Sequence, residues 1–155
     1  MKKIFFFFVT LISLFSCNTD NCSKNLGFNL DYHLFDDIKV NGNTYCQLVN
    51  KALRGNKQAI IDLSKIEVGD GASYQHGAVL IEVIDKISEK EYLNTISSLS
   101  NKEKKTIYYS FIEAGLEYTS NEKYRKKNIE IAFPKLSKVI KCESVGEIGR
   151  FDFSR

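Results

Sequence analysis

Beyond the N-terminal quarter of the chain, apolar residues recur at intervals of three and four, the spacing that aligns them along one face of an α-helix. Successive apolar faces of this kind begin near Cys46, Ala59, Ala72, Tyr92 and Ile107, and short polar or glycine-containing segments separate them. Short connections between amphipathic helices favour antiparallel neighbours. The pattern therefore predicts an all-α domain of about six helices, arranged as a compact bundle or as stacked antiparallel hairpins.

Residues 17–42, ahead of these helices, have no helical periodicity. Apolar side chains alternate with polar ones, as in a half-buried strand, at Phe28, Leu30, Tyr32 and Leu34. The Asn41-Gly42 pair is favoured in tight β-hairpins. We therefore expect an irregular N-terminal tether with room for a short hairpin.

Local signals predict where the helices start and stop. Gly55 ends the first helix, and Asn56 can cap the second. Three later starts carry capping boxes, in which a hydroxyl accepts from the amide three residues on and a glutamate reaches back: Ser88 with Glu91, Ser100 with Glu103, and Thr119 with Glu122. Pro134, the only proline, either kinks the last helix or occupies the first turn of another.

The most apolar helix is predicted over residues 72–87. Its polar strip is narrow and consists of Gln75, Glu82, Asp85 and, just beyond the helix, Glu89. Most of the helix surface is therefore expected to be buried. Gly77 lies within this helix, where the lack of a side chain permits a second helix to approach closely.

Charge is distributed unevenly along the chain. The formal net charge is +3, and removal of Lys2 and Lys3 with the N-terminus leaves +1, too little for a global attraction to nucleic acid. Residues 101–141 contain ten Lys or Arg against five Glu. The densest group of these cations consists of Lys123, Arg125, Lys126 and Lys127. Such a stretch is either a solvated helical surface or a patch for an acidic partner or for lipid head groups.

The first residues combine Lys2 and Lys3 with an uncharged, mostly apolar run over residues 4–16. The run is too short to cross a bilayer as a helix, which takes about 17–25 apolar residues. A basic start, a short apolar core and a small residue before the junction are typical of a secretory signal. We therefore expect residues 1–16 to be a signal peptide.

The junction Leu14-Phe15-Ser16-Cys17 resembles the lipobox of bacterial lipoproteins. This resemblance implies that Cys17 begins the mature chain and carries a diacylglyceryl thioether and an acylated amine, with palmitate as a representative acyl group. Two or more acyl chains hold a protein stably at a membrane. Asn18 stands where an aspartate retains some lipoproteins at the inner membrane, so the outer membrane is the favoured place in the cell envelope.

The body of the chain also has a resemblance of its own. Its "YQHG" and "GLEY" elements, within residues 43–118, are similar to those of small uncharacterised lipoproteins of Gram-negative bacteria. This resemblance implies no activity. The sequence thus divides into four parts: a signal peptide over residues 1–16, a lipidated tether over 17–42, a helical domain over 43–142 and an irregular tail over 143–155.

Three cysteines, Cys22, Cys46 and Cys142, remain after the lipobox cysteine. An oxidising envelope permits a disulfide, and the odd count leaves at least one thiol unpaired. A Cys22–Cys46 bridge and a Cys46–Cys142 bridge are both compatible with the sequence. No Cys-x-x-Cys pair or Cys/His cluster indicates a metal or redox site, and no cofactor is expected.

The stretch "GDGASYQHGAVL", residues 69–80, holds the residues most suggestive of a ligand site. On a helix, His76 lines up with the apolar face, which is typical of a core histidine. Alternatively, Asp70, Tyr74 and His76 form the rim of a pocket at a helix N-terminus, where backbone amides and the helix dipole favour an anion. No nucleophile-elbow pattern surrounds these residues.

These observations predict a lipid-anchored module of the cell envelope that binds another protein, one concrete form being an immunity protein that guards its own cell against a toxin. We expect the membrane, through the lipid on Cys17, and an envelope protein as partners. Two alternatives stay open: an envelope hydrolase that uses His76 with Tyr74 or Asp70, and a purely structural envelope lipoprotein.

Overall fold

The structure is a computed structural model that describes residues 25–26 and 28–148. Apart from one small hairpin, the regular structure of this part is helical, so the predicted all-α class is confirmed. The signal peptide, Cys17 and Cys22 lie outside the described residues. The lipid anchor and the tether boundary therefore stay predictions.

The segment before the first helix is irregular, as expected. The alternating apolar residues do not form the predicted strand, because Tyr32–Leu34 make a short 3-10 helix, η2. The hairpin is present as two-residue strands, β1 (Lys39–Val40) and β2 (Asn43–Thr44), paired antiparallel. Asn41 and Gly42 turn the chain with φ values of 50° and 74°, the left-handed backbone that a two-residue hairpin requires.

Helices α1 (Tyr45–Leu53) and α2 (Lys57–Ser64) follow the hairpin and pack against each other. Gly55, with a φ of 79°, lies in the connection, and the Asn56 side chain accepts a hydrogen bond from the amide of Ala59. The predicted stop and cap are therefore confirmed, because both depend only on neighbouring residues.

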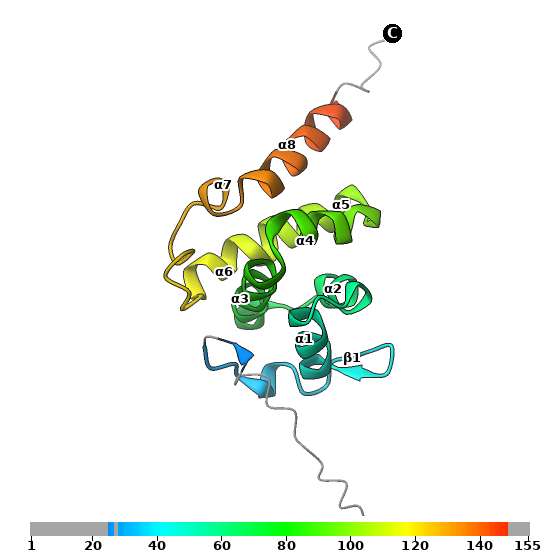
Figure 1. Cartoon of the computed structure of the whole chain (residues 1–155), viewed down its shortest axis with the longest axis vertical. Helices are drawn as coiled ribbons and strands as arrows, with labels where there is room; N and C mark the ends of the chain where they lie inside the picture. The colour runs from blue at the N-terminus through cyan, green and yellow to red at the C-terminus, as the bar shows by residue number, and fades with distance from the viewer. Residues whose placement is uncertain (1–24, 27, 149–155) are drawn as a thin grey trace, which may run out of the picture.

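Helix α3 (Asp70–Ile87) lies at the centre of the molecule and leads into α4 (Glu89–Thr95) and the 3-10 helix η3 (Ile96–Ser98) (Figure 1). It begins two residues earlier than the sequence pattern predicts. The hydroxyl of Ser88, between α3 and α4, accepts from the amide of Glu91, which is one of the two hydrogen bonds of the predicted capping box.

One continuous helical segment then runs through α5 (Asn101–Lys105), the π-helical η4 (Thr106–Ile112) and α6 (Glu113–Tyr118). Its start is the predicted capping box: the Ser100 hydroxyl accepts from the amide of Glu103, and the Glu103 carboxylate accepts from the amide of Ser100. The π-helical turns were not predicted, because no sequence signal marks them.

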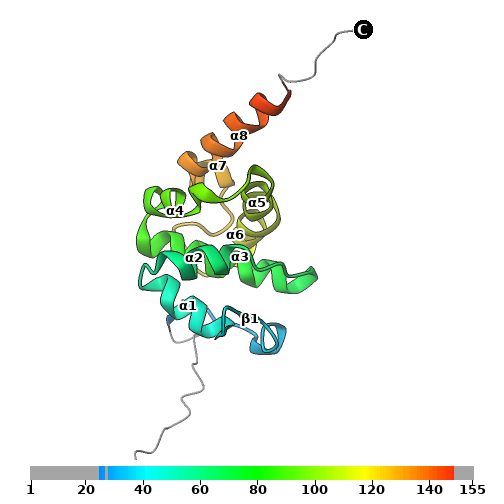
Figure 2. The ribbon, with the colours of Figure 1, turned by 90° about the vertical axis from the view of Figure 1, so that its right-hand side faces the viewer.

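The chain ends, as far as it is described, with α7 (Ile129–Ala132) and α8 (Pro134–Ile148). Pro134 is the first residue of α8, where its missing amide hydrogen costs no hydrogen bond. Helix α8 continues beyond residue 142, where the sequence pattern places the end of the helical domain. It lies at the opposite end of the molecule from α1 and the hairpin (Figures 1 and 2).

Helix α3 and the segment α5–α6 approach each other closely at two glycines. A methyl group added to Gly77 would overlap the carbonyl oxygen of Phe111 and lie 2.8 Å from the amide nitrogen of Gly115. A methyl group on Gly115 would in turn overlap the backbone of Gly77. The prediction that Gly77 permits close helix contact is therefore confirmed, and its partner is a second glycine.

The polar strip along α3 and the start of α4 holds other parts of the chain in place. Each of its four side chains accepts a hydrogen bond from a segment distant in sequence. The Asp31 amide donates to Gln75 at 2.7 Å, and the Leu136 amide donates to Glu89 at 2.7 Å. The Thr119 hydroxyl donates to Glu82 at 3.4 Å. Lys123 and Tyr124 donate to Asp85 at 2.6 and 2.8 Å. The strip thus fastens the N-terminal segment, the α6–α7 connection and α8.

Replacement of Gly77 by alanine should destabilise the fold. The added methyl group overlaps the backbone of Phe111 and Gly115, which can move away only if the whole helical segment shifts. Overpacking of this kind costs about 1–3 kcal/mol of unfolding free energy. Denaturant titration followed by circular dichroism measures the loss. Gly71→Ala is the matched control in the same helix, since its methyl group meets nothing within 4 Å. Equal stability of the two variants would contradict the proposed role of this contact.

Candidate functional site

The connection between α6 and α7, residues 119–128, contains all four cations that the sequence singles out, and we call it the basic loop. It consists of turns, so the helix predicted to start at Thr119 and Glu122 is absent and that prediction is wrong. The Thr119 hydroxyl instead accepts from the amide of Asn121 and donates to Glu82. Because this buried hydroxyl is fixed to α3, the chain leaves the direction of α6 at this point.

The middle of the basic loop is fastened to α3 through Asp85. The Lys123 ammonium and the Tyr124 hydroxyl donate to the same carboxylate oxygen, at 2.6 and 2.8 Å. The Tyr124 ring also stacks on Phe133, with ring centroids 4.9 Å apart, and the Lys123 ammonium lies 4.7 Å from the Tyr124 centroid. Lys123 is therefore an anchor of the loop, and its charge is already paired.

The two carboxylates beneath the basic loop differ in their ionisation. Partial burial raises the pKa of Asp85, but hydrogen bonds from Lys123 and Tyr124 outweigh it and leave the pKa below its usual value. Burial raises the pKa of Glu82, with the nearby charge of Asp85 adding to the effect and hydrogen bonds from Asn121 and Thr119 opposing it. Asp85 thus remains an anion that holds Lys123.

The remaining cations of the basic loop face solvent. Arg125 makes an exposed ion pair with Glu122 at 3.3 Å, a type of contact that contributes little to stability. Lys126 has a φ of 54°, a left-handed backbone that costs free energy for a residue other than glycine, and its amide donates to the Leu116 carbonyl at 2.8 Å. The loop therefore presents the side chains of Lys126 and Lys127 from a fixed backbone.

The predicted pocket rim at the start of α3 does not assemble. His76 is fully buried, whereas 47% of the Tyr74 surface is exposed, so the two side chains do not share a surface. Asp70 is the first residue of α3, and its side chain is outside the described part. Of the two candidate side chains that the structure describes, Tyr74 lies where a ligand could reach it and His76 does not.

His76 belongs to the core, so the interpretation as a core histidine is confirmed. A hydrogen bond of 2.8 Å joins its Nδ1 atom to the Tyr45 hydroxyl, and its ring meets Phe111 edge-on with centroids 4.9 Å apart. Burial lowers the pKa of His76 to about 3, so the ring is neutral at pH 7. The described hydrogen-bond partner of this histidine is therefore a buried tyrosine of α1.

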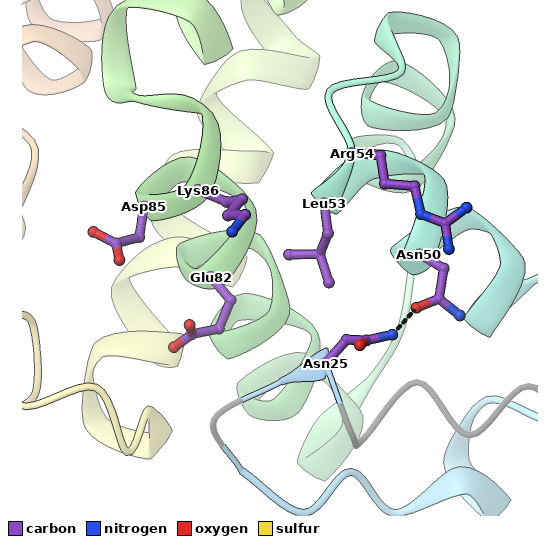
Figure 3. A pocket seen from close by; sticks show the side chains of 7 residues that line it. All are labelled: Asn25, Asn50, Leu53, Arg54, Glu82, Asp85 and Lys86. Carbon is purple, nitrogen blue, oxygen red and sulfur yellow. Dashed lines mark hydrogen bonds between the residues drawn. The ribbon is translucent and has the colours of Figure 1, made fainter.

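A polar pocket of about 270 Å³ lies between α1 and α3, beside the N-terminal segment (Figure 3). Asn25 and Asn50 close one side through a hydrogen bond of 2.6 Å. Figure 3 shows the carboxylates of Glu82 and Asp85 on the far side, directed away from this pair. The polar groups of the pocket do not converge on one point, so it does not define a ligand.

Cys46, which is buried in α1, is disulfide-bonded, and its partner lies outside the described side chains.

Among the residues that the structure describes, no group of three or more His, Cys, Asp or Glu side chains could hold a metal ion. None of the described helices combines the length and apolar character needed to cross a membrane.

Comparisons with known proteins do not extend these observations. No protein-family model matches the chain, and neither the curated proteins nor the solved structures include a significant match. The function must therefore be argued from the residues themselves. The sequence indicated the cations of the basic loop, but it did not indicate that Asp85 anchors this loop. Lys123 and Tyr124 are far from Asp85 in the chain, and no local pattern links them.

The burial of neutral His76 predicts a specific dependence of stability on pH. The unfolded chain binds a proton at this residue near pH 6.5, whereas the folded chain does so only near pH 3. Unfolding free energy should therefore fall as pH decreases from 7 to 5, by at most about 1.4 kcal/mol per pH unit from this residue. Denaturant titrations at several pH values measure the slope.

The matched variant for this titration is Tyr45→Phe/His76→Phe, which leaves no buried hydroxyl without a partner. It should lose most of the slope between pH 7 and 5, while His33→Gln, at an exposed histidine, should keep it. An unchanged slope in the double variant would show that other groups cause the pH dependence.

The anchoring of the basic loop predicts the effect of Asp85→Asn. Loss of the charge should weaken the contacts to Lys123 and Tyr124 and raise the exchange rate of the Lys126 amide, with a small effect on the thermal midpoint. Hydrogen exchange followed by mass spectrometry measures this local opening. Asp37→Asn, at an exposed position outside the loop, serves as the control. Equal exchange at Lys126 in both variants would mean that other contacts hold the loop.

Proposed function

We propose that this chain is a lipid-anchored module of the cell envelope that binds a partner protein through the basic loop. The observation that carries this proposal is the way the loop is held: Asp85 and Glu82 fasten it to α3, while Lys126 and Lys127 project into solvent. A binding surface that is fixed before contact loses less conformational entropy when the partner binds.

The exposed cations indicate a partner with an acidic surface. Complementary charges speed the encounter of two proteins and exclude wrong partners. The strained backbone at Lys126 gives further support, since such residues are concentrated at functional sites. An immunity protein that binds an acidic toxin is one concrete form of this function.

The disulfide of Cys46 supports a location in the envelope, because disulfides persist in oxidising compartments. Its partner must have a Cα atom within about 7 Å, whereas α8, which carries Cys142, lies at the opposite end of the molecule from α1. If Cys17 carries the lipid, its sulfur is not available for a disulfide. We therefore propose Cys22 as the partner, which would tie the tether to α1.

The alternative of an envelope hydrolase centred on His76 has less support. A general base must reach the substrate, and His76 is buried between Tyr45 and Phe111. No observation on the described residues favours the purely structural alternative over the binding module. The binding function is therefore the one that we take forward to experiment.

A cross-linked pull-down from native membranes tests the proposed interface. Lys126→Glu/Lys127→Glu reverses two exposed charges of the loop and leaves Asp85, Lys123 and Tyr124 in place. We expect the double variant to lose the partner that the unmodified lipoprotein captures, and we expect the captured amount to fall as the salt concentration rises.

The control reverses two exposed lysines outside the basic loop, Lys39→Glu/Lys102→Glu, so that both double variants have the same net charge. Retained capture in the control and loss in the loop variant would support the proposed surface. Capture that survives the reversal of Lys126 and Lys127 would exclude it. Absence of any specific partner for the unmodified protein would exclude the binding function.

A further inference from the structure

Apart from the basic loop, a second surface with exposed cations lies where α4 meets α8. A groove of about 440 Å³ runs between α4 with η3 on one side and α8 on the other. Its floor is apolar and consists of Leu93, Ile96, Leu136, Val139 and Ile140. We call it the α4–α8 groove. Val139 and Leu93 are only partly buried, so apolar surface remains open to solvent there.

Among the described residues, the charged side chains that line the α4–α8 groove are three lysines: Lys90, Lys104 and Lys135. These three come from α4, α5 and α8, and the fold brings them to one place from positions far apart in the sequence. Lys90 and Lys135 are exposed, whereas only 9% of the Lys104 surface is accessible. An apolar floor with a positive rim complements a ligand that has an apolar body and a negative end.

The helix starts place two of these cations at the same end of the groove. The Glu89 carboxylate accepts from the amide of Leu136 at 2.7 Å, which joins the first residue of α4 to the first turn of α8. Lys90 and Lys135 are the sequence neighbours of these two residues. The carboxylate of Glu89 also lies at this contact, and Lys90 and Lys135 together outnumber it at this end of the groove.

The dimensions of the α4–α8 groove indicate a small ligand. On α8 its lining residues span positions 135–140, less than two turns or about 9 Å of helix. A stable protein–protein interface buries about 1,200–2,000 Å² in total, far more than so short a groove offers. A volume of about 440 Å³ lies within the range of about 300–1,000 Å³ typical of small-molecule sites.

We infer that the α4–α8 groove binds a single-chain fatty acid. The part of the acyl chain nearest the carboxylate lies along the apolar floor, and a longer chain extends beyond the groove. The carboxylate is held by Lys90 and Lys135 at the end where α4 and α8 begin. Lys104 adds positive potential farther along the groove. This inference rests on the groove alone and is independent of the partner protein proposed for the basic loop.

Binding of a fluorescent polyene fatty acid to the purified full chain carrying Cys17→Ser, which has no lipid of its own, tests the inference. We expect saturable one-to-one binding that palmitate displaces and that methyl palmitate, which lacks the charge, displaces at least tenfold less well. Lys90→Glu/Lys135→Glu should weaken binding at least tenfold, because it removes the charge-assisted hydrogen bonds to the ligand carboxylate and places two negative charges beside it. Val139→Glu, at a partly buried floor position, should do the same.

The control variant Lys39→Glu/Lys102→Glu should bind as the parent does, and circular dichroism should show that all variants remain folded. Three results would overturn the inference: no saturable binding by the parent, equal binding by the parent and both groove variants, or binding of an acidic helical peptide in place of the fatty acid. A groove variant that unfolds is replaced by Lys90→Gln/Lys135→Gln, for which we expect a smaller loss in the same direction.

Discussion

The contact between Gly77 and Gly115 is the constraint on which the rest of the molecule depends. Because no side chain separates α3 from the segment α5–α6, backbone meets backbone there, and the neighbouring side chains must pack around the crossing. Beside this crossing, His76 is enclosed between Tyr45 of α1 and Phe111 of the segment α5–α6. This burial lowers the pKa of His76.

Burial on most sides of α3 leaves a single polar strip, and this strip determines the arrangement of the outer segments. Gln75, Glu82, Asp85 and Glu89 accept hydrogen bonds from three different parts of the chain: the N-terminal segment, the basic loop and α8. A buried or half-buried acceptor is costly when it has no partner, so these bonds favour one arrangement over its alternatives. The fixed basic loop is one product of this arrangement.

The fold also separates the lysines of residues 101–141 into groups with different surroundings. Lys123 is paired with Asp85, Lys126 and Lys127 are presented to solvent, and Lys104 and Lys135 join Lys90 around an apolar groove. The excess of cations in this stretch is therefore divided among an anchor, a proposed protein-binding surface and part of a proposed fatty-acid site.

The sequence by itself determined the helix starts at Asn56, Ser88 and Ser100 and the turn at Asn41-Gly42, because each of these depends on residues at most a few positions apart. It also indicated the close approach at Gly77. The tertiary structure alone decided that Thr119 bonds to Glu82 and starts no helix, and that lysines of three helices meet at one groove. A local hydrogen bond needs only residues a few positions apart, so the sequence can indicate it, whereas these contacts depend on the packing of segments that are distant in the chain. At Thr119 such a distant contact replaced the local one.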